Sequence, residues 1–360
     1  MSDGANAYPT YGPPPGSLPA VGLAIFLTSK SPISAFISFH ITYDSAQKIQ
    51  EGSMSDIQLF RLGAGKVQEL PGKAAAIEKD LQTLIESHME VFLGVRFLDT
   101  EYRTGKTHRG RIDSLGLDEN NCPVIIEYKR HSNENVINQG LFYLDWLLDH
   151  KAEFQLLVME TISKTAAKAI DWSGTRLICI AADFNKYDEH AVQQINRNIS
   201  LIRYKLFADD LLMLELVNAV VENSPQHVIA DGPASGNGKR HIRTQREQLA
   251  STSPALLSLY EQLKSYVLSL SDEVQFKQLK LYDAFRLIRN FLCVAVYPVT
   301  DPHLRLWLKI NPQHIQFEEG FSRDVTHIGH WGTGDVELIV RNEHDLDKAK
   351  LLVEKAYQEN

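Results

Sequence analysis

A strand-like stretch from Gly110 to Arg130 constrains the fold of this 360-residue chain more than any other feature. The sequence GRIDSLGLDENNCPVIIEYKR predicts two mainly apolar strands on either side of the polar turn Glu119–Asn121. Successive side chains of a strand point to opposite faces, so Glu127 and Lys129 share one face of the second strand. The stretch therefore predicts a β-hairpin that carries charged residues among apolar ones.

The length of the turn decides which charged residues face each other. If Glu119–Asn121 forms a three-residue loop, Asp113 lies directly opposite Glu127, with their Cβ atoms about 4.5–5.5 Å apart. Two carboxylates at that distance repel each other unless one is protonated or a cation lies between them. Mg²⁺ binds a few carboxylates and retains water ligands, so the pair predicts a metal site. The alternative is a solvated hairpin face on which Lys129 offsets the two acids.

Two flanking helices add polar residues that could complete such a site. The helix before the hairpin carries Glu78 beside its apolar stripe, where it could turn toward the hairpin as a further metal ligand. Glu86 and Glu90 compete for that role, and the alternative for Glu78 is a solvated helix acid. In the helix after the hairpin, Gln139 and Tyr143 are four residues apart and share one face.

The pattern of helices and strands over residues 74–207 predicts an α/β fold. A helix begins near residue 74 and another spans 133–150. Strands are expected at 96–102, 109–118, 122–130, 154–160, 176–183 and 199–207. Shorter helices are expected at 166–170 and 189–198.

These residues resemble a known family of nucleases. Asp113 followed by the run Glu127-Tyr128-Lys129 resembles the D…(D/E)xK signature of the PD-(D/E)XK nuclease superfamily, which has the restriction-endonuclease-like fold. The resemblance implies that Asp113 and Glu127, and more weakly Glu78, bind Mg²⁺ or Mn²⁺. It implies that Lys129 assists the attacking water. Ile112 precedes Asp113, where the PD-(D/E)XK signature has proline, and that position varies in the superfamily.

A second motif narrows the resemblance to one branch. Gln139-x-x-x-Tyr143 resembles the QxxxY motif of the RecB-like branch, in which these two residues support the substrate or the geometry of the site. The resemblance covers residues 54–221 and implies an αβββαβ core. It implies a metal-dependent nuclease that hydrolyses phosphodiester bonds in DNA, with RNA as the less favoured substrate.

The charge of the chain restricts how it could bind nucleic acid. The formal net charge is −8, so any such contact must come from a local basic patch rather than from the whole surface. Cations near the hairpin form a candidate rim for phosphates: Arg109, Arg111, Arg130 and His131. The alternative function is a non-catalytic nucleic-acid-binding protein on the same fold, which would bind without cleaving.

The chain divides into four segments by composition. Residues 1–53 form an N-terminal extension, expected to be poorly ordered, and residues 222–253 a polar linker rich in Gly, Pro and Ser. The nuclease-like domain spans 54–221. Residues 254–360 form an accessory α/β domain, with helices at 256–270, 281–291 and 344–357 and strands at 303–310 and 335–340. It resembles a domain of unknown function appended to such nucleases, and it could bind a partner protein or form a homodimer.

The cysteine content and the apolar runs bear on the compartment. Cys122, Cys179 and Cys293 are widely spaced and odd in number, which argues against a disulfide framework and favours a reducing cytosol. The apolar stretch Ala20–Ile41 is interrupted by Lys30 and Pro32, so we expect no membrane-spanning helix. A membrane-associating role for that stretch is the less favoured alternative. The sequence therefore predicts a cytoplasmic protein.

Overall fold

The computed structural model places residues 51–360 in one compact unit. It describes residues 57–63, 65–75, 78–105, 109–129, 136–208, 210–220 and 243–360. The predicted extension, residues 1–53, lies outside these ranges. The described residues mix helices and strands in several sheets, so the protein has the predicted α/β class. Among the described helices, none is long and apolar enough to cross a membrane.

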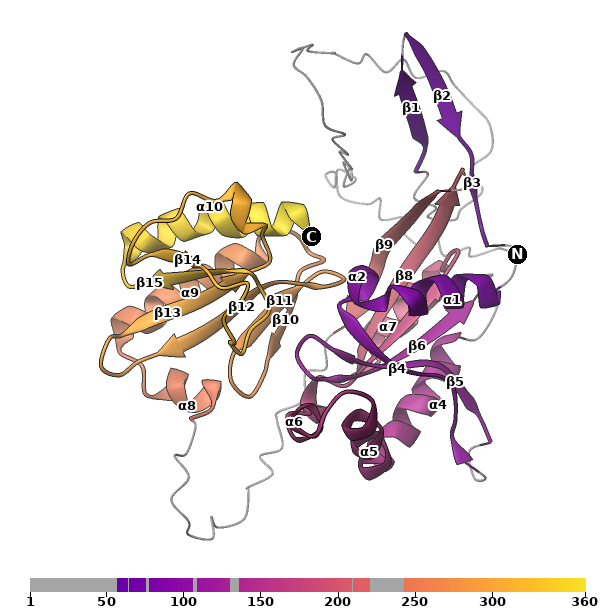
Figure 1. Cartoon of the computed structure of the whole chain (residues 1–360), viewed down its shortest axis with the longest axis horizontal. Coiled ribbons are helices and arrows are strands. Elements are labelled where there is room, and N and C mark those ends of the chain that lie inside the picture. The colour runs from indigo at the N-terminus through magenta and orange to yellow at the C-terminus, as the bar shows by residue number, and fades with distance from the viewer. Residues whose placement is uncertain are drawn as a thin grey trace, which may run out of the picture. The chain divides into compact units, whose positions relative to one another are not determined.

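A seven-stranded mixed sheet forms the centre of the N-terminal part, residues 57–220 (Figure 1). Its strands run in the order β3-β8-β7-β6-β5-β4, and β9 pairs with β8. The pairs β4–β5 and β5–β6 are antiparallel, whereas β7 lies parallel to β6 and to β8. The strands are β3 (Gly72–Lys73), β4 (Val95–Arg103), β5 (Arg111–Asp118), β6 (Pro123–Lys129), β7 (Arg176–Ala181), β8 (Asn198–Phe207) and β9 (Leu211–Val220).

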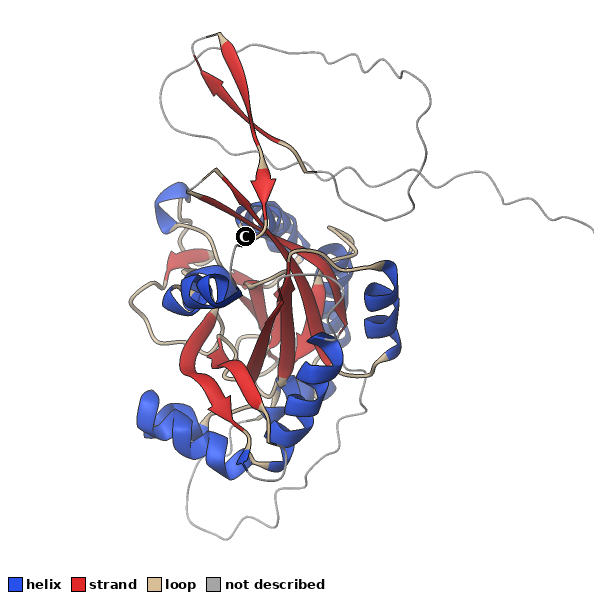
Figure 2. Cartoon of the chain, turned by 90° about the vertical axis from the view of Figure 1, so that its right-hand side faces the viewer, coloured by secondary structure: helices blue, strands red, loops and turns tan. Residues whose placement is uncertain are grey.

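Helices cover both faces of this sheet, and Figure 2 shows its strands running between them. One face packs against α1 (Glu78–Ser87) and α2 (Met89–Leu93), and Val124, Ile126 and Tyr128 point to that side. Ile125 points to the other face, which packs against the remaining helices. They are α4 (Val136–Asp149), α5 (Lys151–Thr161), α6 (Lys164–Lys168) and α7 (Lys186–Gln194). Because residues of a strand alternate, Glu127 lies on the α4 face with Ile125.

Two short elements complete the N-terminal part. β1 (Leu59–Gly63) and β2 (Lys66–Leu70) form an antiparallel hairpin outside the large sheet, and the turn Trp172–Gly174 is a 3-10 helix. Gly174 lies close to Cys122, where a Cβ atom would collide with its Sγ.

The C-terminal part, residues 243–360, contains a six-stranded sheet in which every pair is antiparallel. Its strands are β10 (Gln275–Gln278), β11 (Asp283–Arg286), β12 (Asn290–Tyr297), β13 (His303–Leu308), β15 (Val336–Val340) and β14 (Ser322–Asp324), in that spatial order. Its helices are α8 (Gln245–Ala250), α9 (Pro254–Leu268), the 3-10 turn Pro312–His314 and α10 (Glu343–Glu359). The helices α9 and α10 bury one face of this sheet in a shared apolar cluster.

Three local predictions were wrong. Residues 154–160 lie in helix α5 instead of a strand, since Phe154 and Val158 are buried one helical turn apart, and a short apolar run does not distinguish the two structures. The helix expected at 281–291 is replaced by β11 and β12, where Ala284 and Phe285 point to opposite faces. The linker ends earlier than residue 253, because Thr244 caps α8; residues 221–242 lie outside the described ranges.

Candidate nuclease site

The β5–β6 hairpin has the register that the sequence predicts. Its paired residues run from Ser114 opposite Ile126 to Leu117 opposite Pro123. The turn is closed by a hydrogen bond from the N–H of Asp118 to the carbonyl of Cys122 at 2.9 Å. Oδ1 of Asp118 accepts the N–H groups of Asn120 and Cys122, each at 2.9 Å, so the aspartate side chain shapes the loop.

The two predicted acids are neighbours across this hairpin. The N–H of Asp113 donates to Oε1 of Glu127 at 3.2 Å, and the N–H of Tyr128 donates to Oδ2 of Asp113 at 3.0 Å. Oε2 of Glu127 is buried and has no hydrogen-bond partner among the described residues. The backbone of the opposite strand therefore fixes each carboxylate. Oε2 of Glu127 remains available to a ligand, since no described residue donates a hydrogen bond to it.

Burial makes this acid pair difficult to ionise. Glu127 is completely buried, and burial, followed by repulsion from Asp113, raises its pKa to about 9. Burial also raises the pKa of Asp113, while its bond from the N–H of Tyr128 and the nearby Lys129 act in the opposite direction. In a protein, such a carboxylate pair shares a proton or holds a cation.

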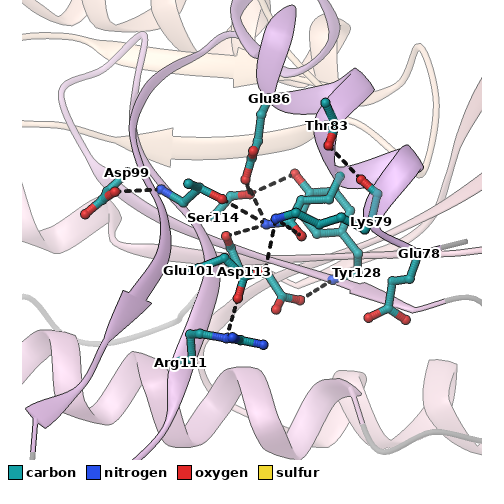
Figure 3. Close-up of polar contacts among 12 residues, drawn as sticks. Glu78, Lys79, Thr83, Glu86, Asp99, Glu101, Arg111, Asp113, Ser114 and Tyr128 are labelled. Carbon is teal, nitrogen blue, oxygen red and sulfur yellow. Dashed lines mark hydrogen bonds and ion pairs between the residues drawn. The ribbon is translucent and has the colours of Figure 1, made fainter.

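Lys129 and Glu78 meet at the edge of the site. Nζ of Lys129 lies 3.4 Å from Oε1 of Glu78, and the lysine side chain is only 13% exposed. The charge of Glu78 also contributes to the raised pKa of Asp113. Figure 3 labels Glu78, Asp113 and Tyr128 in one close-up of these polar contacts. The helix before the hairpin therefore brings its first acid to the predicted site, where it pairs with the lysine.

Gln139 and Tyr143 brace the start of β5. Nε2 of Gln139 lies 3.5 Å from the hydroxyl of Tyr143, which accepts the backbone N–H of Arg111 at 3.2 Å. A side chain at Gly110 would collide with the Tyr143 ring, so glycine permits this close approach. The two residues thus act on the backbone two positions before Asp113 rather than on the carboxylates themselves.

A buried polar network that the sequence did not reveal supports the hairpin from the α1 face. Nε2 of Gln82 donates to the carbonyl of Asp113 at 2.7 Å and to Oε1 of Glu86 at 2.8 Å. The same glutamate oxygen accepts the hydroxyl of Ser114 at 2.7 Å, and Ser114 lies 3.1 Å from the hydroxyl of Tyr128 (Figure 3). Spacing alone offers one signal: Glu78, Gln82 and Glu86 recur every four residues on one helix face.

The structure describes only part of the predicted basic rim. Arg111 is exposed and forms an ion pair with Glu101, which also binds Nζ of Lys79 at 3.0 Å. Arg109 is exposed, with a positive φ of 50°. Arg130 and His131 lie outside the described residues. A partly neutralised Arg111 offers less charge to a phosphate than the sequence suggested.

The carboxylate oxygens at the hairpin are suitable ligands for a divalent cation that prefers oxygen. Among the described residues, no group of three or more His, Cys, Asp or Glu side chains has the geometry to hold a metal. Asp113 and Glu127 nevertheless present two adjacent carboxylates, with an oxygen of Glu127 that accepts no hydrogen bond in the described structure. Mg²⁺ commonly uses one or two protein carboxylates and takes its other ligands from water and substrate phosphates.

Comparisons with known proteins find similarity to one domain family and to one relative. Residues 246–360 match a family described as a domain of unknown function, DUF5655. Over 315 residues the chain is 27% identical to an uncharacterized protein of Haemophilus influenzae, covering 84% of this chain and 100% of that protein. No solved structure matches the chain. The expected C-terminal domain of unknown function is thereby confirmed.

Proposed function

We propose that this protein is a metal-dependent nuclease with a restriction-endonuclease-like core, which hydrolyses phosphodiester bonds in DNA. The observation that supports this best is the cross-strand pairing of Asp113 with Glu127. A fully buried acid beside a partly buried one, both with raised pKa values, is an unfavourable choice for a purely structural hairpin. Such perturbed groups concentrate at functional sites.

The proposal assigns a role to each residue of the site. Asp113 and Glu127 would hold Mg²⁺ or Mn²⁺, with Glu78 as the nearest further acid. When bound, the metal supplies Lewis acidity toward a phosphoryl oxygen. The raised pKa of Glu127 means that this residue must give up a proton before it can serve as a ligand.

Lys129 would stabilise charge that develops on the reacting phosphate. Its ammonium group is the cation on the same strand face as Glu127 and is mostly shielded from solvent. A positioned cation in a site that excludes water stabilises a transition state more strongly than it would in bulk water. Glu78 keeps the ammonium in place through their ion pair.

Gln139 and Tyr143 would act through the backbone of β5. The hydroxyl of Tyr143 accepts the N–H of Arg111, at the start of the strand that carries Asp113. This bond fits a supporting role, and a smaller effect on cleavage than that of the acids follows from it.

The protein would consist of two domains and would lie in the cytoplasm. The nuclease-like domain would span 54–221, and the accessory domain 254–360 would bind a partner or a second copy of the chain. The three cysteines are free and buried, in keeping with a cytoplasmic protein.

A substrate panel tests the proposal. The purified protein is incubated with single-stranded, duplex and branched DNA and with RNA, in the presence of Mg²⁺, Mn²⁺ or EDTA. We expect metal-dependent cleavage of at least one DNA substrate and none with EDTA. Tight binding without cleavage in any metal would instead support the alternative of a non-catalytic nucleic-acid-binding protein.

A further inference from the structure

The turn of the β5–β6 hairpin forms hydrogen bonds with the C-terminal part. Oδ1 of Asn120, at the tip of the turn, accepts Nδ2 of Asn290 at 2.7 Å and the hydroxyl of Tyr282 at 3.1 Å. All three side chains are buried. Buried polar groups are costly unless they form hydrogen bonds, so these bonds favour one position of the turn against the C-terminal part.

Further contacts surround that turn. Oε2 of Glu119 accepts the backbone N–H of Asn290 at 3.0 Å. Asp118 lies between two buried arginines, with Oδ2 3.4 Å from Nε of Arg176 and 3.8 Å from Nη1 of Arg286. One apolar cluster joins the turn to the C-terminal sheet: Cys122, Leu279, Tyr282, Ala284, Cys293, Ala295, Trp307 and Val325.

The same hairpin carries the acid pair. Asp113 lies five residues before Asp118, and Glu127 lies five residues after Cys122. Because the side chains of a strand alternate, a shift of one residue in the pairing would move one acid to the opposite face of the sheet. The position of the turn therefore determines whether the two carboxylates meet.

We propose that the C-terminal part is a register clamp for the acid pair, with Asn290 and Tyr282 as positioning residues for Asp113 and Glu127. This inference rests on the proposed nuclease function of the pair. It gives the domain of unknown function a role at the proposed site, although the hydrogen bonds of the two carboxylates among the described residues come from the hairpin itself.

The clamp has a physical reason. When both acids are ionised they repel each other, and a hairpin can relieve that repulsion by a shift in register or by fraying. The turn is held against this tendency from outside the hairpin, by side chains 162 and 170 residues away in sequence. Residues that lie across a domain contact can thus set the geometry of the acid pair.

Two variants remove contacts of the clamp, and a third variant serves as a matched control. Asn290→Ala removes the bond that Asn290 donates to Asn120 and the one it accepts from Nδ2 of Asn120 at 3.4 Å. It also removes the bonds of the Asn290 side chain to Thr333 and Cys293 within the C-terminal part. Tyr282→Phe removes one hydroxyl. Gln245→Leu is the control: Gln245 is equally buried and hydrogen-bonded to Asp283, Val294 and Val296, all within the C-terminal part. Its loss should lower stability without releasing the turn.

Two readouts separate positioning from stability. In single-turnover cleavage of the best DNA substrate, we expect Asn290→Ala to be about 100-fold slower, as for a displaced catalytic group. Tyr282→Phe should be about fivefold slower, consistent with one lost hydrogen bond. DNA affinity should be unchanged, and Gln245→Leu should cleave at the wild-type rate. Amide hydrogen exchange at Asp113 and Tyr128 should be about tenfold faster in Asn290→Ala than in Gln245→Leu.

The outcomes distinguish the clamp from the nuclease proposal. If the wild-type protein cleaves nothing, the proposed function fails, and hydrogen exchange alone decides whether the clamp exists. If Asn290→Ala and Tyr282→Phe cleave like the wild type, or lose no more protection at Asp113 than Gln245→Leu does, the clamp is overturned. If Asn290→Ala does not fold, the same comparison is made with Tyr282→Phe.

Discussion

The backbone N–H of Asp113 donates a hydrogen bond to Oε1 of Glu127, at 3.2 Å across the β5–β6 hairpin. The bond fixes the glutamate against the strand that carries its neighbour, and it leaves Oε2 buried without a partner among the described residues. A carboxylate oriented by the opposite backbone is arranged before any ligand arrives. That arrangement would reduce the cost of assembling the proposed metal site.

Metal binding should be visible in stability even without a substrate. The proposed function requires Mg²⁺ to bind the folded protein, so millimolar Mg²⁺ should raise the melting temperature relative to EDTA. Glu127→Gln removes one ligand charge and should abolish that rise. The control is Glu86→Gln, which removes a charge from the opposite face of the hairpin. Equal Mg²⁺ responses in both variants would show that the ion binds elsewhere.

The amide group of Gln82 should be required for the full stability of the protein. Gln82→Leu removes the bonds to Asp113 and Glu86, and Gln82→Glu turns a carboxylate oxygen toward the Asp113 carbonyl. We expect each change to destabilise the protein by about 1–3 kcal/mol, the cost of unpaired buried polar groups. Denaturant unfolding measures this loss. Thr83→Ala, on the exposed side of the same helix, is the control and should stay within about 0.5 kcal/mol of the wild type.

The contact between Gly110 and Tyr143 predicts a position that tolerates no side chain. In Gly110→Ala, the new methyl group must displace the Tyr143 ring, which breaks its bond to the N–H of Arg111. We expect a loss of about 1–3 kcal/mol, typical of overpacking. Gly329→Ala is the matched control, since nothing lies near the space its methyl group would fill. Equal stabilities of the two variants would contradict the bracing role of Tyr143.

Stability should depend on pH through Glu119. Burial raises the pKa of this carboxyl from 4.5 to about 7 in the folded protein. The folded state therefore holds a proton that the unfolded state releases, and stability falls as pH rises from about 4.5 to about 7. Glu119→Gln should flatten this part of the curve by on the order of 2 kcal/mol, reduced because the side chain is not fully shielded. Unfolding by urea at several pH values measures the difference; parallel curves for both proteins would refute it.

The hairpin was predictable because local patterns favour it. Alternation placed Ile125 and Glu127 on one face, and a three-residue polar turn set the register that the structure shows. The bonds from Gln82 to Asp113 and from Asn290 to Asn120 were not predictable, because they join residues 31 and 170 positions apart that no local pattern links. The strand assigned to residues 154–160 failed for a related reason. Its apolar run suits either structure, and packing against the rest of the sheet decides for helix α5.

The most direct test of the central claim compares Glu127→Gln and Lys129→Ala with the wild type on one DNA substrate. Both changes leave the predicted basic rim intact, so DNA affinity should stay close to that of the wild type. Single-turnover cleavage should fall by about two to three orders of magnitude in each variant, the usual loss when one group that stabilises transition-state charge is removed. Gln139→Ala should lose less, because it acts on the backbone of β5 through Tyr143. Cleavage by Glu127→Gln and Lys129→Ala at the wild-type rate would show that Asp113, Glu127 and Lys129 are not the catalytic site.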